Sequence, residues 1–142
     1  MFLSSSKVRS QRGISMIEVL VTVVIISFGL LGVAGLLATG LRNNQSSEWR
    51  TQASVLAYDM AERMRSNRQA ALDGLYVTAT SASGVASADK TAWAEALAER
   101  LPSGTGTVAM TDIRYFTIVI QWDDTKGAGG GATEQFEFRG EL

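Results

Sequence analysis

The sequence has no cysteine and no histidine among its 142 residues. Without cysteine, the chain can form no disulfide, no thiolate nucleophile and no zinc–thiolate site. Without histidine, it lacks the commonest general base and the commonest metal ligand. We therefore expect that the protein is not an enzyme and that it uses no metal and no cofactor.

Acidic and basic side chains nearly cancel, because 14 acidic and 13 basic residues leave a net charge of −1. This balance argues against a nucleic-acid partner, since such proteins usually present a basic surface. Leucine, isoleucine, valine and phenylalanine are not scarce, so we expect a folded chain rather than a disordered one. The length suits one modest domain plus an anchor.

A long apolar run near the N-terminus is the strongest single feature. Val19 to Leu41 are 23 residues without a charge. As a helix that rises about 1.5 Å per residue, this run is long enough to cross a bilayer core, and it is longer than the apolar part of an ordinary signal peptide. Three basic residues precede it, which predicts a cytoplasmic N-terminus and an external C-terminal part. These are Lys7, Arg9 and Arg12. A plain membrane anchor is the alternative reading.

One carboxylate, that of Glu18, stands at the head of the apolar run. A charge inside a membrane helix costs free energy, so such residues usually have a partner. If the chain were cut between Gly13 and Ile14, the new ammonium of Ile14 would lie one helical turn from Glu18 on the same face. Glu18 would also lie close to the positive end of the helix dipole. It could pair with its own N-terminus or with that of a neighbouring copy.

The stretch RGISMIEVLVTVVIISFGLLG resembles the class III signal of type IV pilins. That signal has a short basic leader, a glycine, a cut before a hydrophobic residue and a glutamate at the fifth mature position. Gly13, Ile14 and Glu18 match these positions. The resemblance implies that a prepilin peptidase cuts after Gly13 and methylates the amine of Ile14. It also implies that Glu18 selects the assembly register by pairing with an N-terminus.

The helix is expected to continue from about Ile14 to about Asn67, because the stretch after Leu41 lacks proline and glycine up to that point. Apolar residues recur in it at spacings of three and four, which predicts an amphipathic helix that packs on a small head. This stripe consists of Trp49, Ala53, Leu56, Met60 and Met64. Asp73 and Gly74 form the expected stop.

The segment after that stop predicts a loop and a second helix. LYVTAT (75–80) suggests a short strand, and SASGVASAD (81–89) suggests a loop. DKTAWAEALAERLP predicts a helix with Asp89 as its N-cap and Pro102 at its end. Trp93, which begins a spacing of four in this helix, is expected in the core.

Three strands are expected at the C-terminal end, in TGTVAM, IRYFTIVIQW and TEQFEFRGEL. Alternation predicts that one face of the second and third strands points to the core. Its members are Arg114, Phe116, Ile118, Ile120, Trp122, Phe136 and Phe138. The predicted fold is therefore α+β and pilin-like, with a three-stranded antiparallel meander packed on the long helix. Its parts are a cleaved leader (1–13), a hydrophobic helix (14–41), an amphipathic half (42–72) and a head (73–142).

Two charged clusters have alternative interpretations. The basic cluster Arg63, Arg65 and Arg68 suggests phosphate or DNA binding, but interleaved acids favour a solvated helix face. Asp123 and Asp124 precede a glycine-rich loop and suggest calcium, which needs six to eight oxygen ligands. Few others are near in sequence, so a solvated hairpin loop is the preferred interpretation. We expect no metal site.

The segment LRNNQSSEWRTQASVLAYDMAERMRSNRQAALDGLY resembles minor pilins, as do a WDD stretch and a short closing strand. That resemblance implies a subunit that primes pilus assembly in a tip complex supporting adhesion and twitching motility. The implied partners are other minor and major pilins, a tip adhesin, and the assembly platform of the inner membrane. The implied location is the inner membrane, with a periplasmic head, and then the pilus. The alternatives are a minor pseudopilin of type II secretion and a single-span periplasmic enzyme or receptor.

Overall fold

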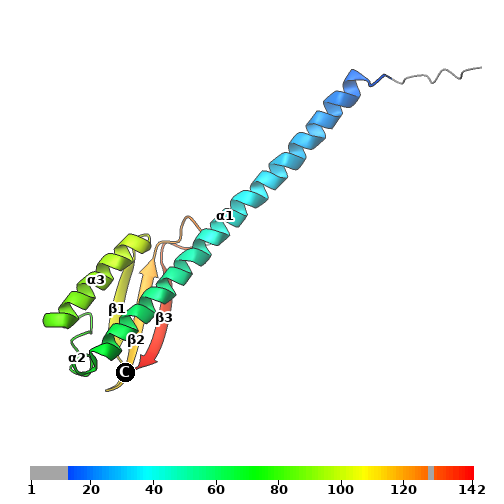
Figure 1. Cartoon of the computed structure of the whole chain (residues 1–142). Helices are drawn as coiled ribbons and strands as arrows, with labels where there is room; N and C mark the ends of the chain where they lie inside the picture. The colour runs from blue at the N-terminus through cyan, green and yellow to red at the C-terminus, as the bar shows by residue number, and fades with distance from the viewer. Residues whose placement is uncertain (1–12, 128–129) are drawn as a thin grey trace, which may run out of the picture. The chain divides into compact units, whose positions relative to one another are not determined.

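The computed structural model describes residues 13–127 and 130–142 and consists of three helices followed by three strands (Figure 1). The elements are α1 (Met16–Ser66), α2 (Arg68–Leu72), α3 (Gly84–Arg100), β1 (Thr105–Met110), β2 (Tyr115–Trp122) and β3 (Glu134–Glu141). This confirms the expected α+β class, with a long N-terminal helix and a small antiparallel sheet.

The chain divides into two compact units, and the boundary between Ala38 and Thr39 lies within α1. Before this boundary, every described residue of α1 is exposed. After it, buried side chains recur every three or four residues, which confirms the predicted amphipathic stripe. The buried residues of α1 are Ala53, Leu56, Ala57, Met60, Ala61 and Met64. Trp49 packs against the same core and is partly buried.

The sheet has the order β1-β2-β3, and both pairs are antiparallel. This is the predicted meander. Alternation along β2 buries Phe116, Ile118, Ile120 and Trp122 against the helices. Arg114 was expected on this inner face, but β2 begins only at Tyr115 and Arg114 is exposed in the preceding turn.

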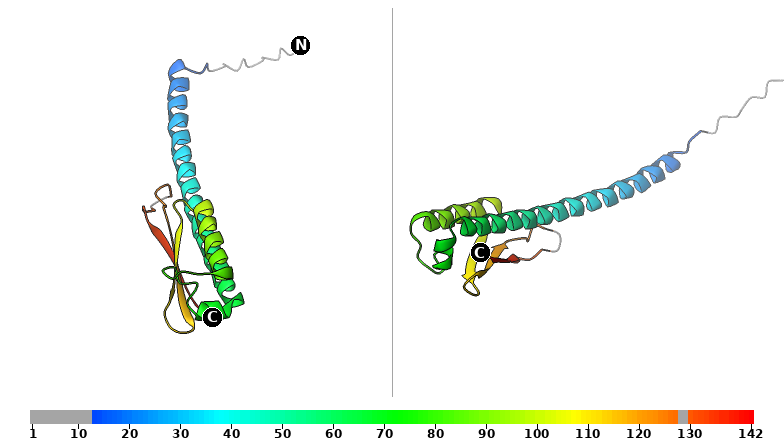
Figure 2. Two further views of the ribbon diagram at one scale, coloured as in Figure 1. Left: turned by 90° about the vertical axis from the view of Figure 1, so that its left-hand side faces the viewer. Right: turned by 60° about the horizontal axis from the view of Figure 1, so that its bottom comes forward.

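Helix α3 lies beside the C-terminal part of α1, and both cover the same face of the sheet (Figure 2). The indole Nε1 of Trp93 donates a hydrogen bond of 2.9 Å to the carbonyl of Leu56, so one side chain joins the two helices inside the core. Trp93 is 4% exposed, which confirms its expected core position.

Two local expectations for this region are wrong. Helix α3 begins at Gly84, so Asp89 lies inside it rather than capping it, and Ser83 is the cap residue. Residues 75–80 form turns rather than a strand. In that segment the backbone amide of Thr78 donates to the carbonyl of Val108 in β1 at 3.0 Å.

Candidate functional site

The N-terminal part of α1 is an apolar surface that the protein itself does not cover. Among the described residues, α1 is the one helix that is long and apolar enough to cross a membrane, and none of its most apolar window is buried. A core helix of a soluble protein passes the same test of length and composition, but it would be mostly buried. The exposure of this segment therefore calls for an external apolar environment such as a bilayer or neighbouring helices.

The polar side chains within this apolar segment are satisfied by the helix itself. The hydroxyl of Thr22 donates to the carbonyl of Glu18 at 2.7 Å, and that of Ser27 donates to the carbonyl of Val23 at 2.7 Å. Such bonds to the preceding turn leave no hydroxyl donor to be solvated. The segment can therefore enter an apolar environment at low polar cost.

The helix start is organised by Ser15, which the sequence interpretation missed. Its hydroxyl accepts a hydrogen bond from the amide of Ile17 at 3.3 Å, and its carbonyl accepts one from the amide of Glu18 at 3.0 Å. A serine followed three residues later by glutamate is the spacing of a capping box, so this signal was available in the sequence. The cap starts the helix close behind Gly13 and Ile14.

Glu18 lies in the first turn of α1 and is exposed. Together with Ile14 it lines a shallow hollow of about 280 Å³, so the two residues lie on one side of the helix start. Within residues 13–127 and 130–142, no side chain forms an ion pair with Glu18. Gly13 is also described and exposed. The predicted leader residues Lys7, Arg9 and Arg12 lie outside the described residues.

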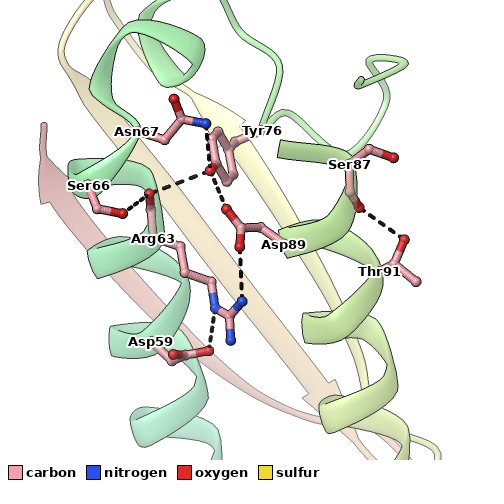
Figure 3. Close-up of polar contacts among 8 residues, drawn as sticks. All are labelled: Asp59, Arg63, Ser66, Asn67, Tyr76, Ser87, Asp89 and Thr91. Carbon is pink, nitrogen blue, oxygen red and sulfur yellow. Dashed lines mark hydrogen bonds and ion pairs between the residues drawn. The ribbon is translucent and has the colours of Figure 1, made fainter. Parts of the chain in front are cut away.

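A second polar site, centred on Arg63, joins α1, α3 and the turn that follows α2 (Figure 3). The guanidinium of Arg63 donates to Asp59 at 2.9 Å and to Asp89 at 3.0 Å. The other carboxylate oxygen of Asp89 accepts a hydrogen bond of 2.5 Å from the hydroxyl of Tyr76. Asn67 donates to the same hydroxyl at 3.3 Å. Asp89 therefore links both helices to the turn.

Two groups of this cluster have raised pKa values, which favour the protonated forms that make its hydrogen bonds. The hydrogen bond from Arg63 to Asp59 raises the pKa of the guanidinium, so its charge is retained. Burial raises the pKa of Tyr76 above its ordinary value of 10.0, and the hydrogen bond to Asp89 adds to this effect. The neutral phenol is thus favoured in the folded chain.

Each arginine of the basic cluster has a hydrogen-bond or ion-pair partner within the protein. Arg63 binds two carboxylates, Arg65 contacts Glu62 at 2.6 Å, and Arg68 donates to the carbonyl of Leu142 at 3.4 Å. Arg63 and Arg65 of α1 thus bind acids, and Arg68 of α2 binds the C-terminal end. The structure therefore gives each of them a place in the fold.

Asp124 departs most clearly from the expected solvated loop, because it is only 1% exposed. Its Oδ2 accepts a hydrogen bond of 2.6 Å from the hydroxyl of Ser46 on α1. Gly127 and Gly130 fold over the carboxylate so closely that an added Cβ would lie 2.3 and 2.4 Å from its oxygens. The glycines are thus needed because the loop closes over Asp124. Among the described residues, no group of three acidic side chains that could hold a metal occurs here or elsewhere.

Comparison with protein families gives a match at the N-terminal end of the chain. Residues 8–34 match the family described as Prokaryotic N-terminal methylation motif. Comparison with curated proteins gave no match, and comparison with solved structures gave none. The motif covers the apolar segment of α1 up to Ala34 and supports a type IV pilin-like or pseudopilin protein anchored in the inner membrane. It implies processing by a prepilin peptidase and association with other pilins.

Proposed function

We propose that this chain is a minor pilin of a type IV pilus, of the kind called PilV or type IV pilus modification protein. The observation that carries the proposal is the methylation motif at the start of an exposed apolar helix, which leads into a small α+β head. The absence of cysteine adds support, because major pilins commonly close a C-terminal loop with a disulfide.

In this proposal, the peptidase removes residues 1–13 by cutting after Gly13 and then methylates the amine of Ile14. Lys7, Arg9 and Arg12 hold the leader on the cytoplasmic side until the cut. The Ser15 cap supports a local geometry in which the helix starts immediately after the new terminus. Residues 14–41 then stay in the inner membrane, while the amphipathic half (42–72) and the head (73–142) lie in the periplasm.

Glu18 is the proposed assembly residue. Once the subunit enters a filament, the apolar surface around Glu18 is covered by neighbouring helices, and the carboxylate loses its water. A buried charge is strongly destabilising unless it is paired, so Glu18 favours the register that places it beside a methylated N-terminus. This pairing selects one arrangement of subunits; it need not add net stability.

The proposal extends to the role of the subunit in pilus assembly and at the pilus tip. A minor pilin of this kind assembles with other minor and major pilins on the inner-membrane platform and primes the growth of the pilus. It then belongs to a tip complex that presents an adhesin, and so supports adhesion and twitching motility.

A minor pseudopilin of type II secretion is the second candidate, because the same motif supports it. Deletion of the gene, with complementation by the wild-type gene, separates the two. The pilus role predicts fewer surface pili and reduced twitching with normal export of folded enzymes. Normal pili with blocked export would instead assign the chain to secretion.

A further inference from the structure

The two edges of the sheet can be assigned from hydrogen bonds at its ends. The amide of Thr111 donates to the carbonyl of Tyr115 at 2.8 Å, so the odd-numbered residues of β2 bond toward β1. The amide of Leu142 donates to the carbonyl of Arg114 at 2.9 Å, so the even-numbered residues bond toward β3. On β3, the backbone groups that point away from the sheet therefore belong to Gln135, Glu137, Arg139 and Glu141.

The outer edge of β1 is covered. The outward amide and carbonyl of Val108 both bond to Thr78, at 2.7 Å and 3.0 Å. Trp93 of α3 lies so close to Gly106 that an added Cβ would be 2.2 Å from its ring. A further strand that paired along this edge would have to displace Thr78 from both backbone groups of Val108.

The outer edge of β3 is open over most of its length. The carbonyl of Glu141 accepts a hydrogen bond of 3.1 Å from Arg65. Within the described ranges, the outward amides and carbonyls of Gln135, Glu137 and Arg139 have no hydrogen-bond partner in the protein, and all three residues are exposed. An exposed edge of this kind is a template for an added strand.

An apolar surface lies beside this open edge. Phe138 points to the inner face of the sheet, and its ring contacts that of Tyr58 on α1, with centroids 4.8 Å apart. Tyr58 is 54% exposed, and Val55, one turn earlier on the same helix face, is 49% exposed. An added strand would place the side chains of its inner face against this aromatic pair. The side chains of its other face, which points to solvent, would lie beside the charged side chains of β3.

The charged side chains on the solvent face of β3 alternate in sign along the strand. Glu137 and Glu141 are acidic and Arg139 between them is basic, and Arg139 contacts Glu137 at 2.6 Å. A strand paired opposite them would be favoured by the inverse charges, since opposite charges across a strand pair stabilise it and like charges destabilise it.

We propose that the free edge of β3 binds an extended segment of a partner protein as an antiparallel fourth strand. The segment alternates apolar and charged residues, with basic residues opposite Glu137 and Glu141 and an acid opposite Arg139. This site lies within the unit that begins at Thr39, so its success or failure does not depend on the proposed processing of the N-terminus.

The occupant is another protein rather than a second anchored copy. Arg50 contacts Glu134 at one end of β3, and Arg65 contacts Glu141 at the other, so α1 runs in the same direction as β3. Antiparallel pairing of two β3 strands would therefore reverse one α1 relative to the other. Two chains that enter their heads from one membrane cannot adopt that arrangement, whereas a free segment can.

The probe for the test is a labelled peptide with the sequence of residues 133–142. In the antiparallel register centred on Phe138, its Glu137 lies opposite Arg139 of the protein and its Arg139 lies opposite Glu137. Fluorescence anisotropy with the full chain in detergent micelles measures its binding. We expect saturable binding to the wild type, and its absence at about 1 mM peptide would overturn the proposal.

Glu137→Pro is the decisive variant, because it removes an outward amide without breaking a bond within the sheet. Glu137→Ala is its matched control and keeps that amide. We expect Glu137→Pro to weaken peptide binding about tenfold or more and Glu137→Ala to weaken it by about threefold or less. Circular dichroism tests whether both variants are folded. If Glu137→Pro is unfolded, Gln135→Pro takes its place. Equal binding by the proline and alanine variants would rule out strand addition at this edge.

Charge exchange tests the pairing itself. The protein variant Glu137→Arg/Arg139→Glu should bind the original peptide more weakly and should regain binding with a peptide carrying the same exchange. Failure of that rescue would contradict the charge pattern. Analytical ultracentrifugation of the full chain tests the occupant, and a dimer that Glu137→Pro abolishes would assign the edge to a second copy instead.

Discussion

The hydroxyl of Ser46 donates a 2.6 Å hydrogen bond to the buried carboxylate of Asp124, which lies 78 residues later in the chain. This contact holds the glycine-rich loop between β2 and β3 against α1. It lies within the unit that begins at Thr39. A polar bond between two distant segments therefore joins the loop to the helix.

Removal of this bond should destabilise the head. Ser46→Ala leaves a buried carboxylate without its hydroxyl donor, and we expect the free energy of unfolding to fall by about 1–3 kcal/mol. Thermal unfolding of the full chain in micelles, followed by circular dichroism, measures the change. Ser47→Ala is the matched control, because Ser47 is exposed and its hydroxyl has no bond within the described part of the chain. Equal melting temperatures for both variants would contradict a stabilising role for the Ser46 bond.

Tyr76 should make the head sensitive to alkali. Its pKa is raised in the folded chain, first by burial and then by the hydrogen bond to Asp89. Above pH 10 the unfolded chain loses this proton while the folded chain keeps it, so the stability it contributes falls as the pH rises. The drop in melting temperature from pH 8 to about pH 10.5 should be larger for the wild type than for Tyr76→Phe.

Tyr115→Phe is the control for this experiment, because Tyr115 is 50% exposed and lies outside the Arg63 cluster. It should keep the wild-type dependence on pH. A Tyr76→Phe protein that loses stability with pH as steeply as the wild type would show that Tyr76 does not carry the effect.

Periodicity in the sequence was sufficient to predict the long helix, its buried stripe and the three-stranded meander. Alternation from Phe116 to Trp122 determined which face of β2 is buried. The start of α3 could not be placed in this way, because Asp89 has the chemistry of an N-cap and instead bonds to Arg63 and Tyr76. Local sequence does not reveal such a tertiary partner.

The residues of the candidate site could likewise be predicted only in part from local sequence. Gly13, Ile14 and Glu18 were predicted from their spacing and stay predictions, and Ser15 could have been found from its distance to Glu18. The burial of Asp124 and the open edge of β3 depend on contacts between distant segments. The sequence therefore predicted a solvated loop at Asp124, where the structure has a closed one.

Glu18 provides the next prediction. Replacement of Glu18 by Ala should leave cleavage intact and reduce incorporation into filaments by about tenfold or more, the factor that corresponds to 1.4 kcal/mol. The reason is that a neighbouring N-terminal ammonium would lose its partner in an apolar environment. The measurement compares the protein in sheared filament fractions with that in membranes. Glu18→Asp, which keeps the charge, should retain more incorporation than Glu18→Ala. Wild-type incorporation of Glu18→Ala would exclude the ion pair.

The most direct test of the proposed processing is the intact mass of the protein extracted from membranes, with and without the prepilin peptidase. Processing at the proposed site predicts a chain that begins at a methylated Ile14 when the peptidase is present and an uncut chain when it is absent. Gly13→Phe should leave the chain uncut in both cases. A chain that still begins at Met1 with the peptidase present, or one cut near Ala38, would contradict the assignment and indicate an ordinary anchor or signal peptide.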